Sequence, residues 1–210
     1  MSLDGTALNS YDWAIWSLPL GVALDATLGD PQGWPHPVRA IGWLIKGGEE
    51  AARNSLAKLQ DGQRFERLAG GILALGVMAI TGGVAWTVVW CCDQLGGAAS
   101  LLGRALLIHW GLAMRDLRDA AHAVATAPDL DCSRRALGRL VGRDTEGLER
   151  AEVNRACVES VAENTNDAVV APLFWYALAG PAGMWVYKAI NTLDSMLGYR
   201  NTRYERLGWA

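Results

Sequence analysis

The sequence feature that most restricts the fold is an uncharged stretch of 25 residues, 68–92. A helix rises about 1.5 Å per residue, so a helix of this length crosses a hydrocarbon core of about 30 Å. Small residues stand four apart at positions 70 and 74 and again at 79 and 83, a spacing that lets a second helix approach closely. The stretch therefore predicts a membrane-spanning helix.

Three further apolar stretches cover residues 13–28, 95–114 and 169–187. The first is near the lower length limit for a spanning helix, and a buried soluble helix is the alternative there. The second fits the other arm of a helical hairpin, with Arg104 either facing the protein interior or reaching the interface. Tryptophans near the ends of these stretches fit interfacial anchors or core residues. We expect one all-α domain, residues 1–210, of the polytopic membrane class.

The polar segments 29–67 and 115–168 are basic where they meet the apolar stretches. The positive-inside rule therefore places both in the cytoplasm and the N-terminus outside. An ordinary span over residues 169–187 would then separate the polar residues on its two sides. Because this stretch contains two prolines and two glycines, we expect a broken or re-entrant last apolar segment that keeps both polar motifs in the cytoplasm.

Composition narrows the class of function. The net charge is only −3, and the basic residues form no patch interleaved with aromatics, so we expect no nucleic-acid partner. The four cysteines form no Cys-x-x-Cys pair, which indicates neither a zinc site nor a disulfide framework and favours a reducing compartment. No basic region precedes the first apolar stretch, so we expect no cleaved signal peptide. The sequence contains no Walker, Gly-x-Ser-x-Gly or Rossmann motif.

A first polar motif precedes the last apolar stretch. We expect a helix that begins with Asp144 or Thr145 as its N-cap. On this helix Glu159 and Glu163 are four residues apart, so they share one face and repel each other unless a cation or a substrate ammonium is bound. Residues 164–167 add oxygen ligands of the kind that Mg²⁺ accepts. The alternative is a solvated acidic face with a capping turn.

A second polar motif follows the last apolar stretch. Lys188, Asn191 and either Asp194 or Ser195 lie on one helical face, at intervals of three and four residues. Lysine can hold a phosphate group and aspartate a metal ion. The alternative is a ladder of hydrogen bonds within the helix.

A third polar motif near the N-terminus places Asp30, His36 and Arg39 around three prolines that fix the loop. A lone histidine is more often structural than catalytic, so a structural role is the alternative here. From the residues alone, the chain is predicted to be a polytopic membrane protein with an acidic cytoplasmic site that is compatible with Mg²⁺.

Several longer motifs together resemble those of a known family. They occupy residues 24–25, 29–31, 35–37, 141–145, 159–164, 170–175 and 188–201. Over residues 14–210 the chain is similar to the CobD/CbiB family, the adenosylcobinamide-phosphate synthases of cobalamin biosynthesis, although the family often has Asp-Gly where this chain has Asp167-Ala168. Members are longer, so the chain is expected to be C-terminally incomplete. The resemblance implies a multi-pass protein of the plasma (inner) membrane whose active site faces the cytoplasm.

The resemblance implies an acid-amine ligase that acts on a corrinoid. Such an enzyme joins a propionate carboxylate of adenosylcobyric acid to (R)-1-amino-2-propanol or its O-phosphate, with ATP as co-substrate and Mg²⁺ as the metal. The other implied partners are membrane lipid and other enzymes of the cobalamin pathway.

The chemistry of this reaction motivates a hypothesis for each site residue. The expected catalytic residues are Glu159 as the base, Glu163, Lys188 and Asp194. The expected metal ligands are Glu163, Asp167 and Asp194. The expected substrate-binding residues are Asp30, His36, Arg39, Arg143, Asp144, Asn164, Asn191 and Arg200.

Two other classes of function compete with the ligase. A membrane component that binds or transports a corrinoid without ligase activity would also suit an intramembrane Arg104 and a broken last segment. A purely structural helical module is the third class, and the density of polar residues around the last apolar stretch argues against it.

Overall fold

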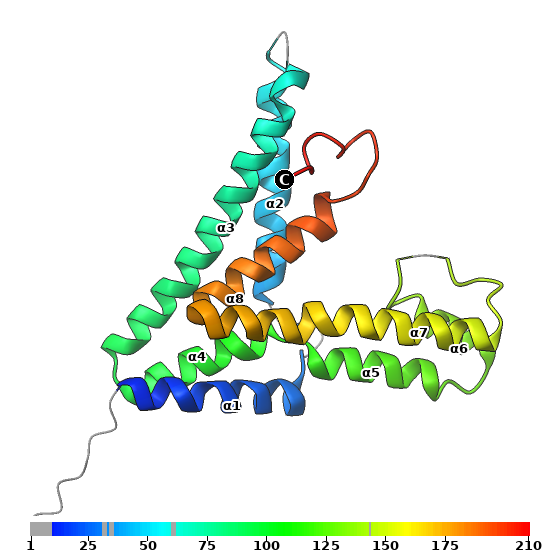
Figure 1. Cartoon of the computed structure of the whole chain (residues 1–210), viewed down its shortest axis with the longest axis horizontal. Helices are drawn as coiled ribbons and strands as arrows, with labels where there is room; N and C mark the ends of the chain where they lie inside the picture. Colours follow the sequence, from blue (N-terminus) through cyan, green and yellow to red (C-terminus); the bar gives the residue numbers. More distant parts are fainter. Residues whose placement is uncertain (1–9, 31–32, 34–35, 60–61, 143) are drawn as a thin grey trace, which may run out of the picture.

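The computed structural model describes residues 10–30, 33, 36–59, 62–142 and 144–210, with side chains from residue 15 onward. Within these residues every regular element is a helix (Figure 1). The helices are α1 (Ser10–Leu28), α2 (Pro37–Leu56), α3 (Gly62–Gln94), α4 (Gly97–Gly111), α5 (Met114–Ala125), α6 (Leu130–Leu137), α7 (Arg150–Thr165), the π-helical turn η1 (Asn166–Val170) and α8 (Ala171–Leu197). The prediction of an all-α fold is confirmed.

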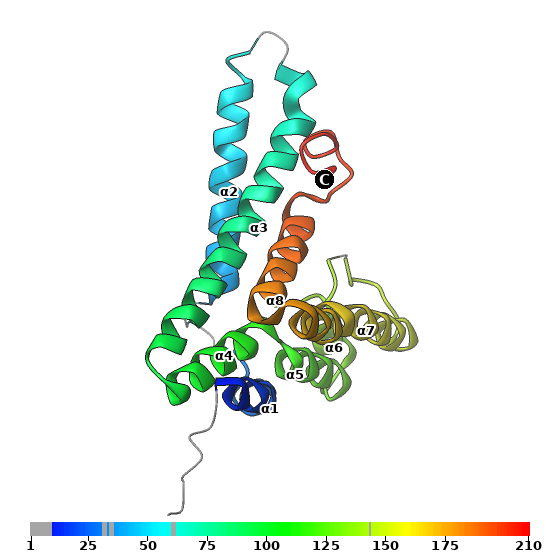
Figure 2. The same cartoon turned by 60° about the vertical axis from the view of Figure 1, so that its left-hand side comes forward.

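The helices form two groups that meet near the middle of the molecule (Figures 1 and 2). In the first group, α2, α3 and the second half of α8 run side by side. Their shared core contains Ile41 and Ile45 from α2, Val77 from α3, and Trp185 and Ala189 from α8. In the second group, α1 packs along α4, while α5, α6 and α7 pack together around a separate small core.

Three helical segments are long and apolar enough to cross a membrane, namely Gly62–Gln94, Gly97–Ala125 and Arg150–Leu197. The outer face of α3 exposes large apolar side chains such as Leu68, Ile72 and Leu75, each more than 60% exposed. Such a surface is costly in water but matches lipid tails. The structure is therefore that of a polytopic helical membrane protein, as predicted. The expected first span is represented by a shorter apolar helix, Ile15–Leu28.

Polar contacts close the hairpin between α3 and α4. Arg104 Nη2 donates to Asp93 Oδ2 at 3.0 Å, and Ser100 Oγ donates to Asp93 Oδ1 at 2.6 Å. Arg104 also contacts the Ser100 hydroxyl. Arg104 was predicted either to face the protein interior or to reach the membrane interface. In the structure it faces the protein, and its ion pair with Asp93 offsets the cost of an arginine in an apolar helix.

The last apolar segment is broken inside α8, as predicted. Ala179 and Gly180 leave the helical conformation, and Gly180 has φ +63°, a left-handed value that glycine adopts without steric cost. Pro181 follows and cannot donate a backbone hydrogen bond to the preceding turn. Beyond this break the second half of α8 turns toward α2 and α3 (Figure 1). The prediction of a break is confirmed, and the prediction that it keeps both polar motifs in the cytoplasm stays a prediction.

The buried carboxylate of Asp25 joins α1 to α5. The backbone N–H of Met114 donates to Asp25 Oδ2 at 3.0 Å, and Asp25 is only 2% exposed. Ala113, the N-cap residue of α5, offers no side-chain cap, so Asp25 supplies the missing acceptor from another helix. This contact fixes the C-terminal end of α1, which lies just before Asp30.

The C-terminal segment, residues 198–210, folds back onto α2 and α3. Arg203 Nη2 donates to the buried carboxylate of Glu49 at 3.0 Å, and Arg53 Nε donates to the same oxygen at 2.8 Å. Burial raises the pKa of Glu49, but the two arginines outweigh this effect and hold the pKa below its ordinary value. Gly70 allows the carbonyl of Leu207 to approach α3 more closely than any side chain would permit.

Candidate active site

A cavity of about 470 Å³ lies between α7, η1 and the second half of α8. Its lining combines the polar motifs from both sides of the last apolar segment, which are far apart in the sequence. The lining residues are Leu140, Val141, Gly142, Ala156, Glu159, Ser160, Glu163, Asn164, Asp167, Asn191, Asp194 and Ser195. Four carboxylates, two amides and two hydroxyls thus face one space.

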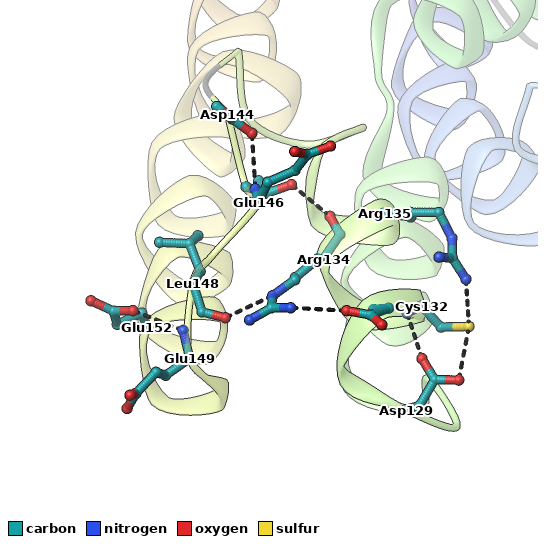
Figure 3. Close-up of polar contacts among 11 residues, drawn as sticks. Asp129, Cys132, Arg134, Arg135, Asp144, Glu146, Leu148, Glu149 and Glu152 are labelled. Carbon is teal, nitrogen blue, oxygen red and sulfur yellow. Dashed lines mark hydrogen bonds and ion pairs between the residues drawn. The ribbon is translucent and has the colours of Figure 1, made fainter.

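The helix that carries the glutamates begins later than we predicted. Glu149 is the N-cap of α7, and its backbone N–H donates to the Glu152 carboxylate at 2.8 Å in a capping box (Figure 3). Asp144 instead accepts a hydrogen bond from the N–H of Glu146 at 2.9 Å, and Thr145 Oγ1 donates to the carbonyl of Arg134 at 3.0 Å. The prediction of Asp144 or Thr145 as N-cap is wrong because both side chains serve the preceding loop.

Arg134 holds the connection from α6 to α7, as Figure 3 shows. Its Nε donates to the carbonyl of Leu148 at 2.8 Å, and its Nη1 donates to Asp131 Oδ1 at 2.8 Å. Together with the bond from Thr145, these contacts tie the loop to α6. The start of this loop reaches the cavity, because Leu140 contributes to the cavity lining and its carbonyl accepts a hydrogen bond from Ser160 Oγ at 3.1 Å.

The π-helical turn presents Asp167 to the cavity. Tyr187 Oη donates to Asp167 Oδ1 at 3.0 Å, and Asn191 Nδ2 donates to Asp167 Oδ2 at 3.0 Å. Asn166 Nδ2 adds a bond to Oδ1 at 2.9 Å. π-Helical turns inserted into α-helices are frequent at functional sites. Three hydrogen bonds therefore hold the carboxylate of Asp167 at the cavity.

Tyr187 is a residue of this site that was not predicted from the sequence. It lies four residues before Asn191 on α8, so the two side chains share one helical face. That spacing was the available signal. The partner on η1 was not predictable from the spacing, because it depends on how the two helices pack.

The N-terminal motif adjoins the end of the cavity at which Asp167 lies. Lys188 is half-buried and interacts electrostatically with both Asp167 and Asp30. His36 Nε2 lies 3.1 Å from Asp30 Oδ2, and His36 also interacts electrostatically with Lys188 and Arg39. The structure therefore brings residues of the three polar motifs near one another, with Asp30 after α1, His36 before α2, Asp167 on η1 and Lys188 on α8.

His36 also has a local structural role. Its Nδ1 accepts a hydrogen bond from the N–H of Val38 at 3.2 Å, so His36 is the N-cap of α2. Burial lowers the pKa of His36, against the opposing effect of Asp30, and this favours the neutral imidazole that the cap requires. The structure thus supports the alternative that His36 has a structural role. This role is compatible with a contact between His36 and substrate.

Some predicted substrate-binding residues lie elsewhere. Asp144 and Arg200 are exposed and do not belong to the cavity lining. Arg39 is exposed near the start of α2 and interacts with His36. Arg143 lies outside the described residues, directly after the lining residue Gly142.

The carboxylates form an open set of ligands. In the part of the chain that the structure describes, no three His, Cys, Asp or Glu side chains are grouped closely enough to hold a metal ion alone. Mg²⁺ commonly keeps several water ligands and binds through one or two carboxylates plus substrate phosphates. Glu163, Asp167 and Asp194 line one cavity and are oxygen ligands, so their chemistry fits such an ion.

Fold and site together define a polytopic helical membrane protein with an acidic cavity built around a broken helix. Residues 18–210 match the CobD/Cbib protein family, and the chain belongs to that family. It is 44% identical over 196 residues to a protein of Pelobacter propionicus named cobalamin biosynthesis protein CobD, covering 92% of this chain and 58% of that protein.

Two further relatives have similar names. The chain is 43% identical to the cobalamin biosynthesis protein CobD of Klebsiella pneumoniae and 42% identical to the cobalamin biosynthesis protein CbiB of Salmonella typhimurium. Each match covers 88% of this chain and 58% of the relative. The chain thus spans less than two thirds of the length of these relatives. No solved structure matches it.

Proposed function

We propose that this protein acts in cobalamin biosynthesis as an ATP-dependent ligase of the plasma (inner) membrane. It would join a propionate carboxylate of adenosylcobyric acid to the amino group of (R)-1-amino-2-propanol or of its O-phosphate. One observation carries the proposal. The cavity gathers Glu159, Glu163, Asp167 and Asp194 from two distant motifs, with Lys188 beside Asp167.

The reaction needs ATP because a carboxylate is a poor acyl donor. In the proposed first step, a carboxylate oxygen of the corrinoid attacks the γ-phosphorus of ATP and releases ADP. In the second step, the free amine attacks the acyl carbon of the resulting acyl phosphate. The carbon–oxygen bond breaks, inorganic phosphate leaves, and the amine nitrogen loses a proton as the amide forms.

Each charged group has a role that suits its position. Glu159 lines the cavity and would take the proton from the substrate ammonium, so that the free amine attacks. Lys188 would bind phosphate oxygens, since its ammonium group carries three donors. Glu163, Asp167 and Asp194 would hold Mg²⁺, which when bound neutralises charge on the transferring phosphoryl group.

The amide side chains of the cavity serve to position other groups. Asn191 donates to Asp167 and so fixes the direction of a proposed metal ligand. Asn164 donates to the carbonyl of Ser160 at 2.8 Å, which orients its amide group along the cavity wall. Both amides would also provide hydrogen bonds to substrate, because each lines the space in which substrate would lie.

Mass spectrometry of the amide product tests the proposed function. The purified protein in detergent would be incubated with adenosylcobyric acid, Mg-ATP and aminopropanol or aminopropanol phosphate. We expect an amide product with either or both amines, and none when ATP is omitted. Tight corrinoid binding without product from either amine would contradict the ligase and support the binding or transport alternative.

A further inference from the structure

A second polar cavity, of about 630 Å³, lies at the opposite end of the α2–α3 hairpin from His36. It is formed by the end of α2, the start of α3 and the C-terminal segment, which lie together at the top of Figures 1 and 2. Among the residues that the structure describes, its lining includes three guanidinium groups, of Arg53, Arg64 and Arg206, and one carboxylate, of Glu66. This basic cavity plays no part in the proposed ligase reaction.

The arginines of the basic cavity differ in how their charge is balanced. Arg53 donates to the buried carboxylate of Glu49, so much of its charge is offset. Arg206 is held differently, because its Nη1 donates to the carbonyl and the side-chain oxygen of Gln63 at 3.4 and 3.3 Å. Both of these acceptors are neutral. The contacts of Arg206 therefore fix the guanidinium group at the cavity without neutralising it.

The basic cavity lies next to the start of the uncharged stretch of α3. The uncharged stretch of α3 starts at Leu68, four residues after Arg64. Trp209 packs beside it, with its indole N–H donating to the carbonyl of Arg67 at 3.0 Å and its ring 5.9 Å from the Arg67 guanidinium. Tryptophan and arginine in this arrangement are typical of the membrane–water interface. If Leu68 marks the start of the membrane-spanning part of α3, the cavity lies at the level of phospholipid head groups.

We propose that the basic cavity binds the phosphate group of an anionic phospholipid. Arginine forks match phosphate oxygens in charge and geometry, and anionic phospholipids attract arginines near a membrane surface. A soluble phosphate ester shares this chemistry. The lipid is favoured because the exposed side chains of Phe65 and Leu68 lie on α3 next to Arg64, where acyl chains of a bound lipid would run.

Native mass spectrometry of the purified protein in detergent tests this site. The probe is dioctanoyl phosphatidylglycerol, compared with dioctanoyl phosphatidylcholine. We expect Arg64→Gln and Arg206→Gln each to weaken phosphatidylglycerol binding about fivefold, the factor that corresponds to about 1 kcal/mol per basic residue. Arg206→Lys should retain most of the binding, because it keeps the charge.

The controls separate this site from general attraction of positive charge to lipid. Arg150→Gln removes an exposed arginine at the start of α7 and should leave phosphatidylglycerol binding unchanged. Equal binding by all variants, or no preference over phosphatidylcholine, would overturn the proposal. Displacement of the lipid by inorganic phosphate or ATP at equal concentration would also overturn it, because the site would then serve a soluble phosphate. None of these readouts depends on ligase activity.

Discussion

The substitution Tyr187→Phe isolates one hydrogen bond of the acidic cavity. It removes only the phenolic oxygen, which donates to Asp167 Oδ1 at 3.0 Å. A hydrogen bond to a charged group contributes about 1.5–3 kcal/mol, and about 1.4 kcal/mol corresponds to a tenfold change in rate. Asn191 and Asn166 still hold the carboxylate, so we expect the lower end of this range. The kcat of amide formation should fall about tenfold.

Initial rates of amide formation, followed by mass spectrometry, give this value directly. The matched control is Tyr176→Phe, which removes a hydroxyl 3.1 Å from Ser17 Oγ, away from the acidic cavity. We expect the control to keep kcat within about twofold of the unmodified protein. Tyr187→Phe should also raise the Mg²⁺ concentration needed for half-maximal rate, because Asp167 is a proposed ligand. Unchanged kcat, or an equal fall in both variants, would refute the role of Tyr187.

Two further predictions concern groups whose pKa is shifted. Because Arg53 and Arg203 lower the pKa of Glu49, its carboxylate stabilises the fold above the ordinary pKa of 4.5, and this contribution is lost as pH falls through the folded value. Glu49→Gln should lower Tm by about 2–4 °C at pH 7 and by progressively less as the pH falls below 4.5, and a shift that does not change with pH would contradict this. His36→Asn keeps a side chain that can cap α2, so its Tm should equal that of the unmodified protein. The rate of amide formation should fall, and an unchanged rate would exclude a contact between His36 and substrate.

Much of the architecture was predictable because its signals are local. The length of the uncharged stretch, as a helix, exceeds the thickness of the hydrocarbon core. In lipid such a segment forms a helix because its backbone polar groups must be paired within the segment, and this predicted α3. The glycine and proline at 180 and 181 marked the break in α8. Glu163 and Asp194 were predicted from the sequence together as ligands of one metal ion, and both residues line the same cavity in the structure.

The remaining features depend on contacts between distant residues. Asp25 caps α5 by accepting a hydrogen bond from Met114, which lies 89 positions later in the sequence. No pattern of residues within α1 indicates this contact. The start of α7 was misplaced because Asp144 and Thr145 have the side chains of N-cap residues but are used by the preceding loop. Tyr187 was missed because its partner is presented by a π-helical turn, whose position is not visible in the spacing of side chains.

The central claim is that the acidic cavity is the site of amide formation. Its most direct test is the initial rate of amide formation by Glu163→Gln and Asp194→Asn, beside Glu50→Gln as an exposed-carboxylate control on α2. Loss of a metal ligand removes several kcal/mol of charge stabilisation, so we expect rates below about 1% for the two cavity variants. The control should keep its full rate. Full rates from folded Glu163→Gln and Asp194→Asn proteins would contradict the account.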